Sequence, residues 1–217
     1  MSSFLQVLGP ASGALAAGLT ATVAVSAVAV LLGAALGFVF GLALTYGGRL
    51  GSLPVRIIVD VVRGTPVLVL ILAAFYMPAG LGLSPGPITA GVVALTVFCA
   101  AHVGETLRGA LIAIPPAQTD AARSIGLTFT GTLLSVLLPQ AVRQIMPNFV
   151  NTAVEIVKAS SLLSAIGVGE LILTTQEVIG RTYMTMQFYA LAGALYLAVN
   201  LAIGTAGGWV EHRFRLR

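Results

Sequence analysis

The stretch Asp120-Ala-Ala-Arg-Ser-Ile-Gly126, followed after nine residues by Val136-Leu-Leu-Pro139, decides how this chain is interpreted. It forms a short polar island in an otherwise apolar sequence. Pro115 and Pro116 precede it, and proline is tolerated in the first turn of a helix, where its missing N–H would have had no partner. Gly126 can adopt the left-handed conformation that ends a helix. The pattern predicts a helix of about two turns, which is marginal alone in water and is therefore expected to dock against another protein.

The composition around this island is typical of a membrane protein. The 217 residues are 58% hydrophobic and only 8% charged, against roughly 25% charged in an ordinary soluble domain. No charged residue precedes Arg49, and none lies between Arg63 and Glu105 or between Arg181 and Glu211. Each gap exceeds the roughly 20 apolar residues that cross a bilayer as a helix, and a backbone in lipid must satisfy its own hydrogen bonds. The sequence therefore predicts an all-α, polytopic membrane protein.

The chain is expected to form a single transmembrane domain over residues 1–217, with about five membrane-spanning helices. The apolar runs that define these spans lie at about Ala14–Tyr46, Pro54–Tyr76, Ile88–Leu107, Leu134–Val157 and Phe188–Trp209. Arg63-Gly-Thr-Pro66 interrupts the second span, and the glycine- and proline-rich segment 77–87 predicts an external turn. The first apolar run is too long for a secretory signal peptide and has no basic region before it.

Three glycines in the first span, Gly33, Gly37 and Gly41, recur every four residues. This spacing places them on one helix face, where a second backbone can approach closely. Close packing within one subunit is the favoured interpretation, and contact between two subunits is the alternative.

Basic residues concentrate on one side of the five-span topology: Arg49, Arg108, Arg123, Arg213, Arg215 and Arg217. Only Lys158 and Arg181 fall near the other side. Because basic residues favour the cytoplasmic side, we expect the polar island and the C-terminus in the cytoplasm and the N-terminus outside. The net charge of +4 is explained in this way, and no nucleic-acid partner is expected because the basic residues form no continuous patch.

Residues that could carry catalysis or bind a metal are sparse. A P-loop needs a Gly-Lys-Ser/Thr triplet, and the single lysine, Lys158, is not in one. Cys99 is the only cysteine, so it can form neither an intrachain disulfide nor a cysteine-based metal site. His102 and His212 lie in different elements, and His102 is expected to be a hydrogen-bonded structural residue. We therefore predict that the chain is not an enzyme and binds no metal or cofactor itself.

Four stretches, in this order, are informative together: Arg63-Gly-Thr-Pro-Val-Leu68; Glu105-Thr-Leu-Arg108-Gly109 with Ile114-Pro115 and Gln118; Asp120-Ala-Ala-x-x-x-Gly126 with Val136-Leu-Leu-Pro139-Gln-Ala141; and Lys158-Ala-Ser-Ser-Leu162 with Ile166-Gly167-Val168 and Glu170-Leu171. Their types and spacing resemble the membrane permease subunits of bacterial ABC importers, in the class that serves polar amino acids (histidine, glutamine, arginine or opines). The resemblance extends roughly from Gly18 to the C-terminus.

The resemblance implies the transmembrane domain of a type I ABC importer, in which the segment at about 115–139 is a cytoplasmic coupling loop. Two permease subunits, identical or related, would form the pathway in the bacterial cytoplasmic (inner) membrane. Two ABC ATPase subunits would bind ATP and Mg, and an extracytoplasmic solute-binding protein would deliver the solute. The residues expected to couple the permease to the ATPase are Asp120, Ala121, Ala122, Arg123, Gly126 and Leu127.

Within this coupling helix, Ala117, Ala121 and Ala122 are expected to form the small-residue face that lies close to the partner. Leu127 and Phe129 are expected to be apolar anchors beside them.

Polar residues near the fourth span are candidates for the substrate path: Asn148, Asn151, Glu155, Lys158, Ser160 and Ser161. Ionisable residues in a membrane are costly and are functional candidates by default. Glu155 and Lys158 are three residues apart, so they share a helix face and could pair. The alternative is that Lys158 is a structural anchor at the outer interface. Arg63 and Glu105 are expected to form a structural ion pair.

The chain departs from the class pattern at three positions. Asp120 replaces the usual Glu, Pro116 replaces a polar residue, and Ala159 stands where the class often has Asp. If that Asp helps to bind cationic solutes, its absence disfavours arginine, lysine or histidine as the cargo. The alternatives are a same-fold permease for methionine, phosphonate or peptide and, less favoured because the two halves do not mirror each other, an ATP-independent secondary transporter.

Overall fold

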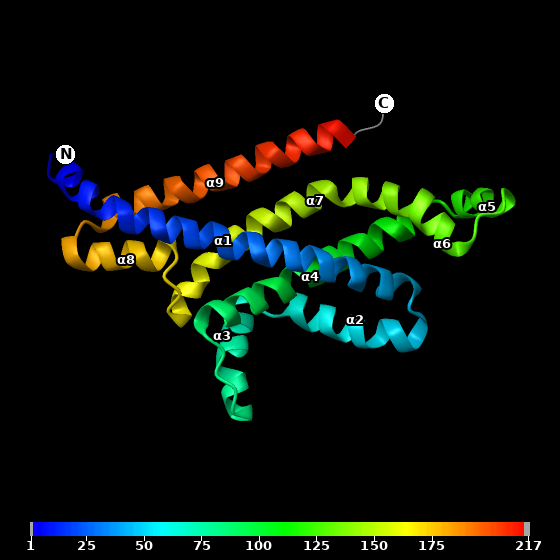
Figure 1. The fold of residues 1–217 in the computed structure, drawn as a ribbon, viewed down its shortest axis with the longest axis horizontal. Coiled ribbons are helices and arrows are strands. Elements are labelled where there is room, and N and C mark those ends of the chain that lie inside the picture. The colour runs from blue at the N-terminus through cyan, green and yellow to red at the C-terminus, as the bar shows by residue number, and fades with distance from the viewer. Residues whose placement is uncertain (1, 215–217) are drawn as a thin grey trace.

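The computed structural model describes residues 2–214, with side chains described for residues 4–211. In that part of the chain all regular structure is helical, and the helices form an elongated bundle (Figure 1). The side chains of Arg213, Arg215 and Arg217, which enter the predicted orientation, lie outside the described residues.

The described helices are α1 (Ser2–Tyr46), α2 (Gly48–Gly64), α3 (Val67–Tyr76), α4 (Pro87–Ala113), α5 (Pro116–Ser124), α6 (Phe129–Thr132), α7 (Leu138–Ala159), α8 (Leu171–Thr182) and α9 (Thr185–Phe214). Tight 3-10 turns cover Met77–Leu81 and Ser160–Ile166, and a wider π turn covers Leu133–Leu137. The predicted spans correspond to α1, to α2 with α3, to α4, to α7 and to α9. The sequence pattern did not predict α8.

Four helical runs in the described residues are long and apolar enough to cross a membrane: Phe4–Tyr46, Pro87–Ala113, Phe129–Ile166 and Thr185–Glu211. The second predicted span is a bent pair, in which α2 and the helical segment Val67–Leu81 are bent by 113° relative to each other. Thr65 has an extended backbone, with ψ of 135°, because the following Pro66 disfavours helical geometry at the residue before it. The all-α membrane fold is therefore confirmed, with the second span broken at the predicted interruption.

The glycine face of α1 packs against α4 in the same subunit. A Cβ added at Gly37 would lie 2.7 Å from the Cβ of Val103, and one added at Gly41 would lie 2.8 Å from the Cβ of Leu107. A Cβ at Gly33 would meet the side chain of Cys99 at a comparably short distance. Only glycine allows the two backbones to approach this closely, so the favoured interpretation, packing within one subunit, is confirmed.

The π turn at Leu133–Leu137 has its cause in the proline that follows it. Pro139 has no N–H to donate, and its ring would clash with the carbonyl four residues earlier in a regular helix. A single wider turn relieves this conflict, and α7 follows it without a break. The long run Phe129–Ile166 therefore stays continuous despite the proline.

The two ends of the bundle differ. The short helix α5 lies at the extreme of one end, to which the turn between α1 and α2 also points, whereas the start of α1 and helix α8 lie at the other end (Figure 1). Near the α5 end, an apolar cluster that includes Leu107, Leu137 and Ala141 joins α4 to α7. At the other end, Leu171 and Phe188 anchor α8 and α9 against α1.

Candidate functional site: the projecting helix α5 and a polar cavity

Helix α5 begins and ends where its sequence predicts. Pro115 precedes the first turn, and its carbonyl accepts the N–H of Gln118 at 3.0 Å. Gly126 has φ of +83°, in the left-handed region, and its N–H donates to Arg123 O at 2.9 Å. The N–H of Leu127 donates to Ala122 O at 3.1 Å, which completes the two bonds of a Schellman motif. These bonds satisfy carbonyls that would otherwise be unpaired and fix the shape of the helix end.

The inner face of α5 holds it against the rest of the chain. Ala122 is 4% exposed, and the Gln140 side-chain amide donates to the Gln118 side-chain carbonyl oxygen at 2.5 Å. The prediction that Ala122 belongs to the partner-facing surface was therefore wrong. The reason is helical geometry, because Gln118 and Ala122 are four residues apart and share the face that α7 covers.

The outer face of α5 has no partner within the described part of the chain. Ala117, Asp120, Ala121 and Arg123 are exposed, and the Asp120 and Arg123 side chains make no ion pair with any described residue. Ile125, at the C-terminal end of α5, is 79% exposed, and the sequence pattern did not identify it as part of this surface. This surface combines two uncompensated charges with an apolar tip.

The two predicted apolar anchors are less exposed than Ile125. Leu127 is half-buried, and Phe129 is 55% exposed with its ring edge-on to Tyr46, at 5.2 Å between ring centroids. Phe129 thus ties the α5 segment to the end of α1, and Ile125 is the most exposed of these three apolar side chains.

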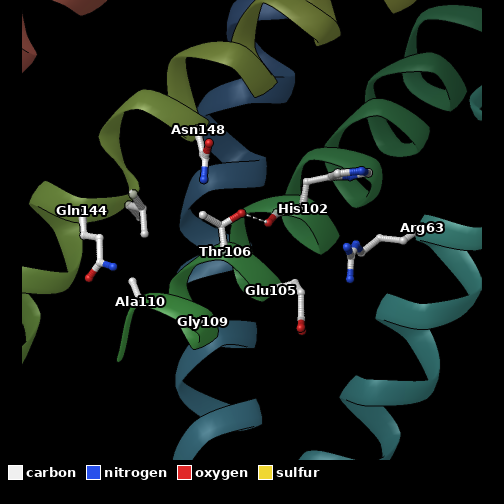
Figure 2. Close-up of a pocket in the computed structure, with 9 residues that line it drawn as sticks. Arg63, His102, Glu105, Thr106, Gly109, Ala110, Gln144 and Asn148 are labelled. Atoms are coloured by element: carbon white, nitrogen blue, oxygen red, sulfur yellow. Dashed lines mark hydrogen bonds between the residues drawn. The ribbon is translucent and has the colours of Figure 1, made fainter. Parts of the chain in front are cut away.

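A second candidate site is a cavity of about 330 Å³ between α2, α4 and α7. Its lining is mostly polar and consists of Arg63, His102, Glu105, Thr106, Gly109, Ala110, Gln144, Ile145 and Asn148. Figure 2 shows Arg63 projecting from α2 toward His102 and Glu105 of α4, while Gln144 and Asn148 approach from α7. The structure thus brings together Arg63, Glu105 and Asn148, which the sequence pattern assigned to two different roles.

The charges beside this cavity are paired differently from the prediction. Glu105 accepts a hydrogen bond from Arg56 at 2.9 Å and from the Arg108 Nε at 3.0 Å. Asp60 lies 3.9 Å from the Arg56 guanidinium. The predicted ion pair between Arg63 and Glu105 is therefore not formed. Arg56 lies two turns before Arg63 on the same face of α2, and it reaches Glu105 instead.

His102 has the structural hydrogen bond that the sequence predicted. Its Nδ1 lies 2.9 Å from Phe98 O, and its ring packs against the Phe98 ring at 4.3 Å between centroids. Thr106 donates to His102 O at 2.8 Å. The same histidine also lines the cavity, which the sequence did not predict.

The polar positions on α7 form a stripe that is mostly accessible. Asn148, Asn151, Glu155 and Lys158 are all exposed, and at about 100° per residue they lie on one side of the helix. Glu155 and Lys158 do not approach within 4.0 Å of each other, so their predicted pairing is not formed in the described structure.

The two serines at the end of this stripe are bonded to the backbone instead. Ser160 is fully buried and donates to Val157 O at 2.8 Å, so its assignment to the path surface was wrong. Ser161 donates to Lys158 O at 2.7 Å. Both hydroxyls therefore bond to backbone carbonyls at the point where α7 ends and a 3-10 turn begins.

A buried carboxylate that sequence reasoning left without a role caps α8. Glu170 is 0% exposed and accepts the N–H groups of Ile172 and Leu173 at 2.9 Å each. The Tyr196 hydroxyl donates to it at 2.7 Å, and burial raises the pKa of the Glu170 carboxyl. The side chain thereby joins α8 to α9. The only sequence feature that could have predicted this cap is an acidic residue directly before an apolar run. Glutamate is not among the residues preferred at the N-cap of a helix, so the sequence did not predict it.

Comparison with known proteins gives a consistent picture. The family model described as "Binding-protein-dependent transport system inner membrane component" matches residues 29–216. The glutamine transport system permease protein GlnP of Escherichia coli (strain K12) is 28% identical over 213 residues, 97% of each chain. The octopine transport system permease protein OccM of Rhizobium radiobacter is 32% identical over 206 residues, 88% of this chain and 81% of that protein. A chain from the crystal structure of an amino acid ABC transporter with histidines matches with a TM-score of 0.89 and 28% identity, over 97% of this chain and 98% of that one.

Proposed function

This chain belongs to the family of binding-protein-dependent transport system inner membrane components, and we propose from this membership that it is the transmembrane subunit of an ATP-driven ABC importer for polar amino acids. The similarity to permeases named for glutamine and octopine supports this class of solute. The similarity in fold to an amino acid ABC transporter supports the same class.

The observation that carries the proposal is the outer face of α5. Asp120 and Arg123 have no charged partner among the described residues, and Ile125 is 79% exposed beside them. Such a surface fits a protein cleft that supplies opposite charges and an apolar pocket. We propose that each of two ATPase subunits, which bind ATP and Mg, receives the α5 of one permease subunit.

The rest of the assembly follows from the same proposal. A second permease subunit, either a copy or a relative, completes the pathway, and an extracytoplasmic solute-binding protein delivers the solute. We propose that the chain lies in the bacterial cytoplasmic membrane with its N-terminus outside and its C-terminus in the cytoplasm. Arg49 and Arg123 support this orientation, because both lie toward the α5 end, opposite the start of α1.

The proposed solute path combines the cavity with the polar stripe of α7. Asn148 belongs to both, so the two features are continuous. Asn151, Glu155 and Lys158 extend the polar surface from the cavity toward the end of α7, and all three are exposed. A zwitterionic solute would find hydrogen-bonding groups along this route.

Reconstitution tests the proposed function. The permease, its ATPase subunits and the solute-binding protein are placed in proteoliposomes, and accumulation of radiolabelled glutamine, histidine and arginine is followed with and without ATP. We expect concentrative uptake of at least one of these amino acids that requires ATP and all partners. Concentrative uptake by the permease alone, without ATP, would instead support a secondary transporter and refute the proposal.

A further inference from the structure

A pair of side-chain amides joins the projecting helix α5 to the membrane-spanning helix α7. The Gln140 Nε2 donates to the Gln118 Oε1 at 2.5 Å. Among the residues whose side chains the structure describes, this is the one hydrogen bond that connects α5 with another helix. Both glutamines are half-buried, and partial shielding from water strengthens a hydrogen bond. The only polar connection of α5 in this part of the chain therefore leads to the helix that carries the polar stripe.

A neighbouring backbone carbonyl fixes the direction of this bond. The Gln140 Nε2 also donates to Val136 O at 2.7 Å, and a carbonyl oxygen can only accept. The amide nitrogen of Gln140 must therefore face Val136, and both of its hydrogens are used. It follows that Gln118 presents its side-chain oxygen, and that the two glutamines have different roles in one bond.

Gln140 lies directly after the irregular part of its helix. Val136 belongs to the π turn Leu133–Leu137, and Pro139 immediately precedes Gln140. A π turn is a local departure from regular α-helical winding and is frequent at functional sites. A displacement of Gln140 would therefore act on α7 beside its least regular turn.

Gln140 is also aligned with the polar cavity. Gln144 and Asn148 follow it at intervals of four residues, so the three side chains lie on one side of α7. Gln144 and Asn148 line the cavity, as Figure 2 shows. At 1.5 Å per residue, Asn148 lies about 12 Å from Gln140 along the helix axis. A rotation or shift of α7 at Gln140 would therefore move the cavity lining.

We propose that Gln118 and Gln140 are positioning residues that transmit a displacement of α5 to α7 and thereby to the cavity. The inference rests on the proposed function and specifies its coupling step, in which an ATPase subunit moves α5. The ring contact between Phe129 and Tyr46 attaches the segment after α5 to α1 instead. The amide pair is thus the connection that leads toward the proposed solute path, and it acts without touching solute or ATP.

The different roles of the two glutamines give a test in the complete reconstituted transporter, with uptake per ATP hydrolysed as the measured ratio. Gln118→Leu and Gln140→Leu should each lower this ratio by about two- to tenfold, as expected for the loss of one neutral hydrogen bond. Gln118→Glu keeps an oxygen that accepts, so it should couple normally. Gln140→Glu would place an oxygen against Val136 O, so it should not. Leu at both positions should cause little further loss, because the two residues act through one bond.

A second readout follows the transmission itself. The labelling rate of Asn151→Cys by a maleimide is measured in the assembled complex, in a Cys99→Ala background. ATP should change this rate when the amide pair is intact and should leave it unchanged in Gln140→Leu. The matched control for both readouts is Gln187→Leu, which removes an exposed glutamine from the first turn of α9 and should have no effect. Melting temperatures and co-purification of the ATPase show whether each variant is folded and assembled.

Three results would overturn the inference. The folded and assembled Leu variants could couple normally, or their loss of coupling could be accounted for by loss of the ATPase. The variants Gln118→Glu and Gln140→Glu could have equal effects. ATP could change the labelling equally with and without the amide pair. In each of these cases, ATP-dependent uptake by the unmodified complex would still support the proposed function, whereas absence of that uptake would refute both.

Discussion

Substitution of Gly126 separates backbone strain from steric conflict at the end of α5. The residue has φ of +83°, and an added Cβ would meet nothing within 4 Å in this chain. A side chain therefore fits without a clash. Its effect must come from the left-handed backbone, which costs an ordinary L-residue about 1–2 kcal/mol. Asparagine tolerates this conformation better than most residues, and a β-branched residue tolerates it worst.

The size of the expected effect follows from the shortness of the helix. The strain falls on the two bonds that end α5, from Gly126 to Arg123 and from Leu127 to Ala122. A cost of about 1–2 kcal/mol changes an equilibrium by a factor of about 5–30, so a considerable share of molecules would lose the ordered helix end. Most of the buried core lies elsewhere, so the melting temperature of the subunit should change little.

The assay is ATP hydrolysis and solute uptake by the reconstituted complex, with Gly126 replaced in turn by Asn, Ala and Val. We expect the amount of uptake per ATP hydrolysed to fall in that order, while membrane insertion stays normal. If Asn is as harmful as Val, a clash with the partner and not backbone strain is responsible. If all three variants couple normally, the shape of the α5 end has no part in coupling and the reasoning is refuted.

Four further predictions follow from particular contacts. Gly37→Ala should destabilise the subunit by about 1–3 kcal/mol in thermal unfolding in detergent, since its Cβ would lie 2.7 Å from the Val103 Cβ. The control Gly13→Ala should not destabilise the subunit, because nothing lies within 4 Å of a Cβ added there. Equal effects of the two substitutions would contradict the close packing of α1 against α4. Glu105→Gln should lower the free energy of unfolding by about 1–3 kcal/mol because two guanidinium groups lose their carboxylate. Adding Arg56→Gln to Glu105→Gln should cause little further loss. If the two losses are fully additive in denaturation, the ion pair between Arg56 and Glu105 is contradicted. The pKa of Glu170 is raised in the folded protein, so this group stabilises the fold at low pH and loses that effect as the pH rises through the raised pKa. The melting temperature should therefore fall above the pH at which glutamate ordinarily titrates, and this fall should be smaller in Glu170→Gln. An unchanged pH profile of the melting temperature would show that another group is responsible. Ile125→Ser should weaken the affinity for the ATPase by about tenfold, measured by co-purification, because it removes an exposed apolar side chain. The neighbouring control Ser124→Ala should have no effect. If the Ile125→Ser variant still retains the ATPase, Ile125 is not part of the interface.

The membrane spans and α5 could be predicted because their signals are local. Long uncharged gaps identify spans, and the pair Pro115 and Gly126 identifies the ends of a short helix. The helix α8 has no such signal, because at 12 residues it is too short for a span and it carries polar Gln176 and Glu177. Its start is fixed by Glu170, whose capping role depends on burial that only the folded chain provides.

The partners of charged groups could not be predicted for a different reason. Arg56 and Arg63 share one face of α2, so either could reach a carboxylate on a neighbouring helix. The choice depends on how α2 and α4 are set against each other, and the sequence spacing contains no information on that offset. The pairing of Gln118 with Gln140, which turns Ala122 inward, is likewise a contact between two helices and is absent from the helical pattern of α5 alone.

Labelling of a cysteine at Ala121 tests the central claim most directly, in a Cys99→Ala background that leaves no other thiol. Ala121 is exposed on the outer face of α5, so a membrane-impermeant maleimide should reach it. In sealed inside-out vesicles we expect rapid labelling without the ATPase subunits and strong protection when they are bound. Labelling from the extracellular side, or labelling that bound ATPase does not slow, would contradict the account.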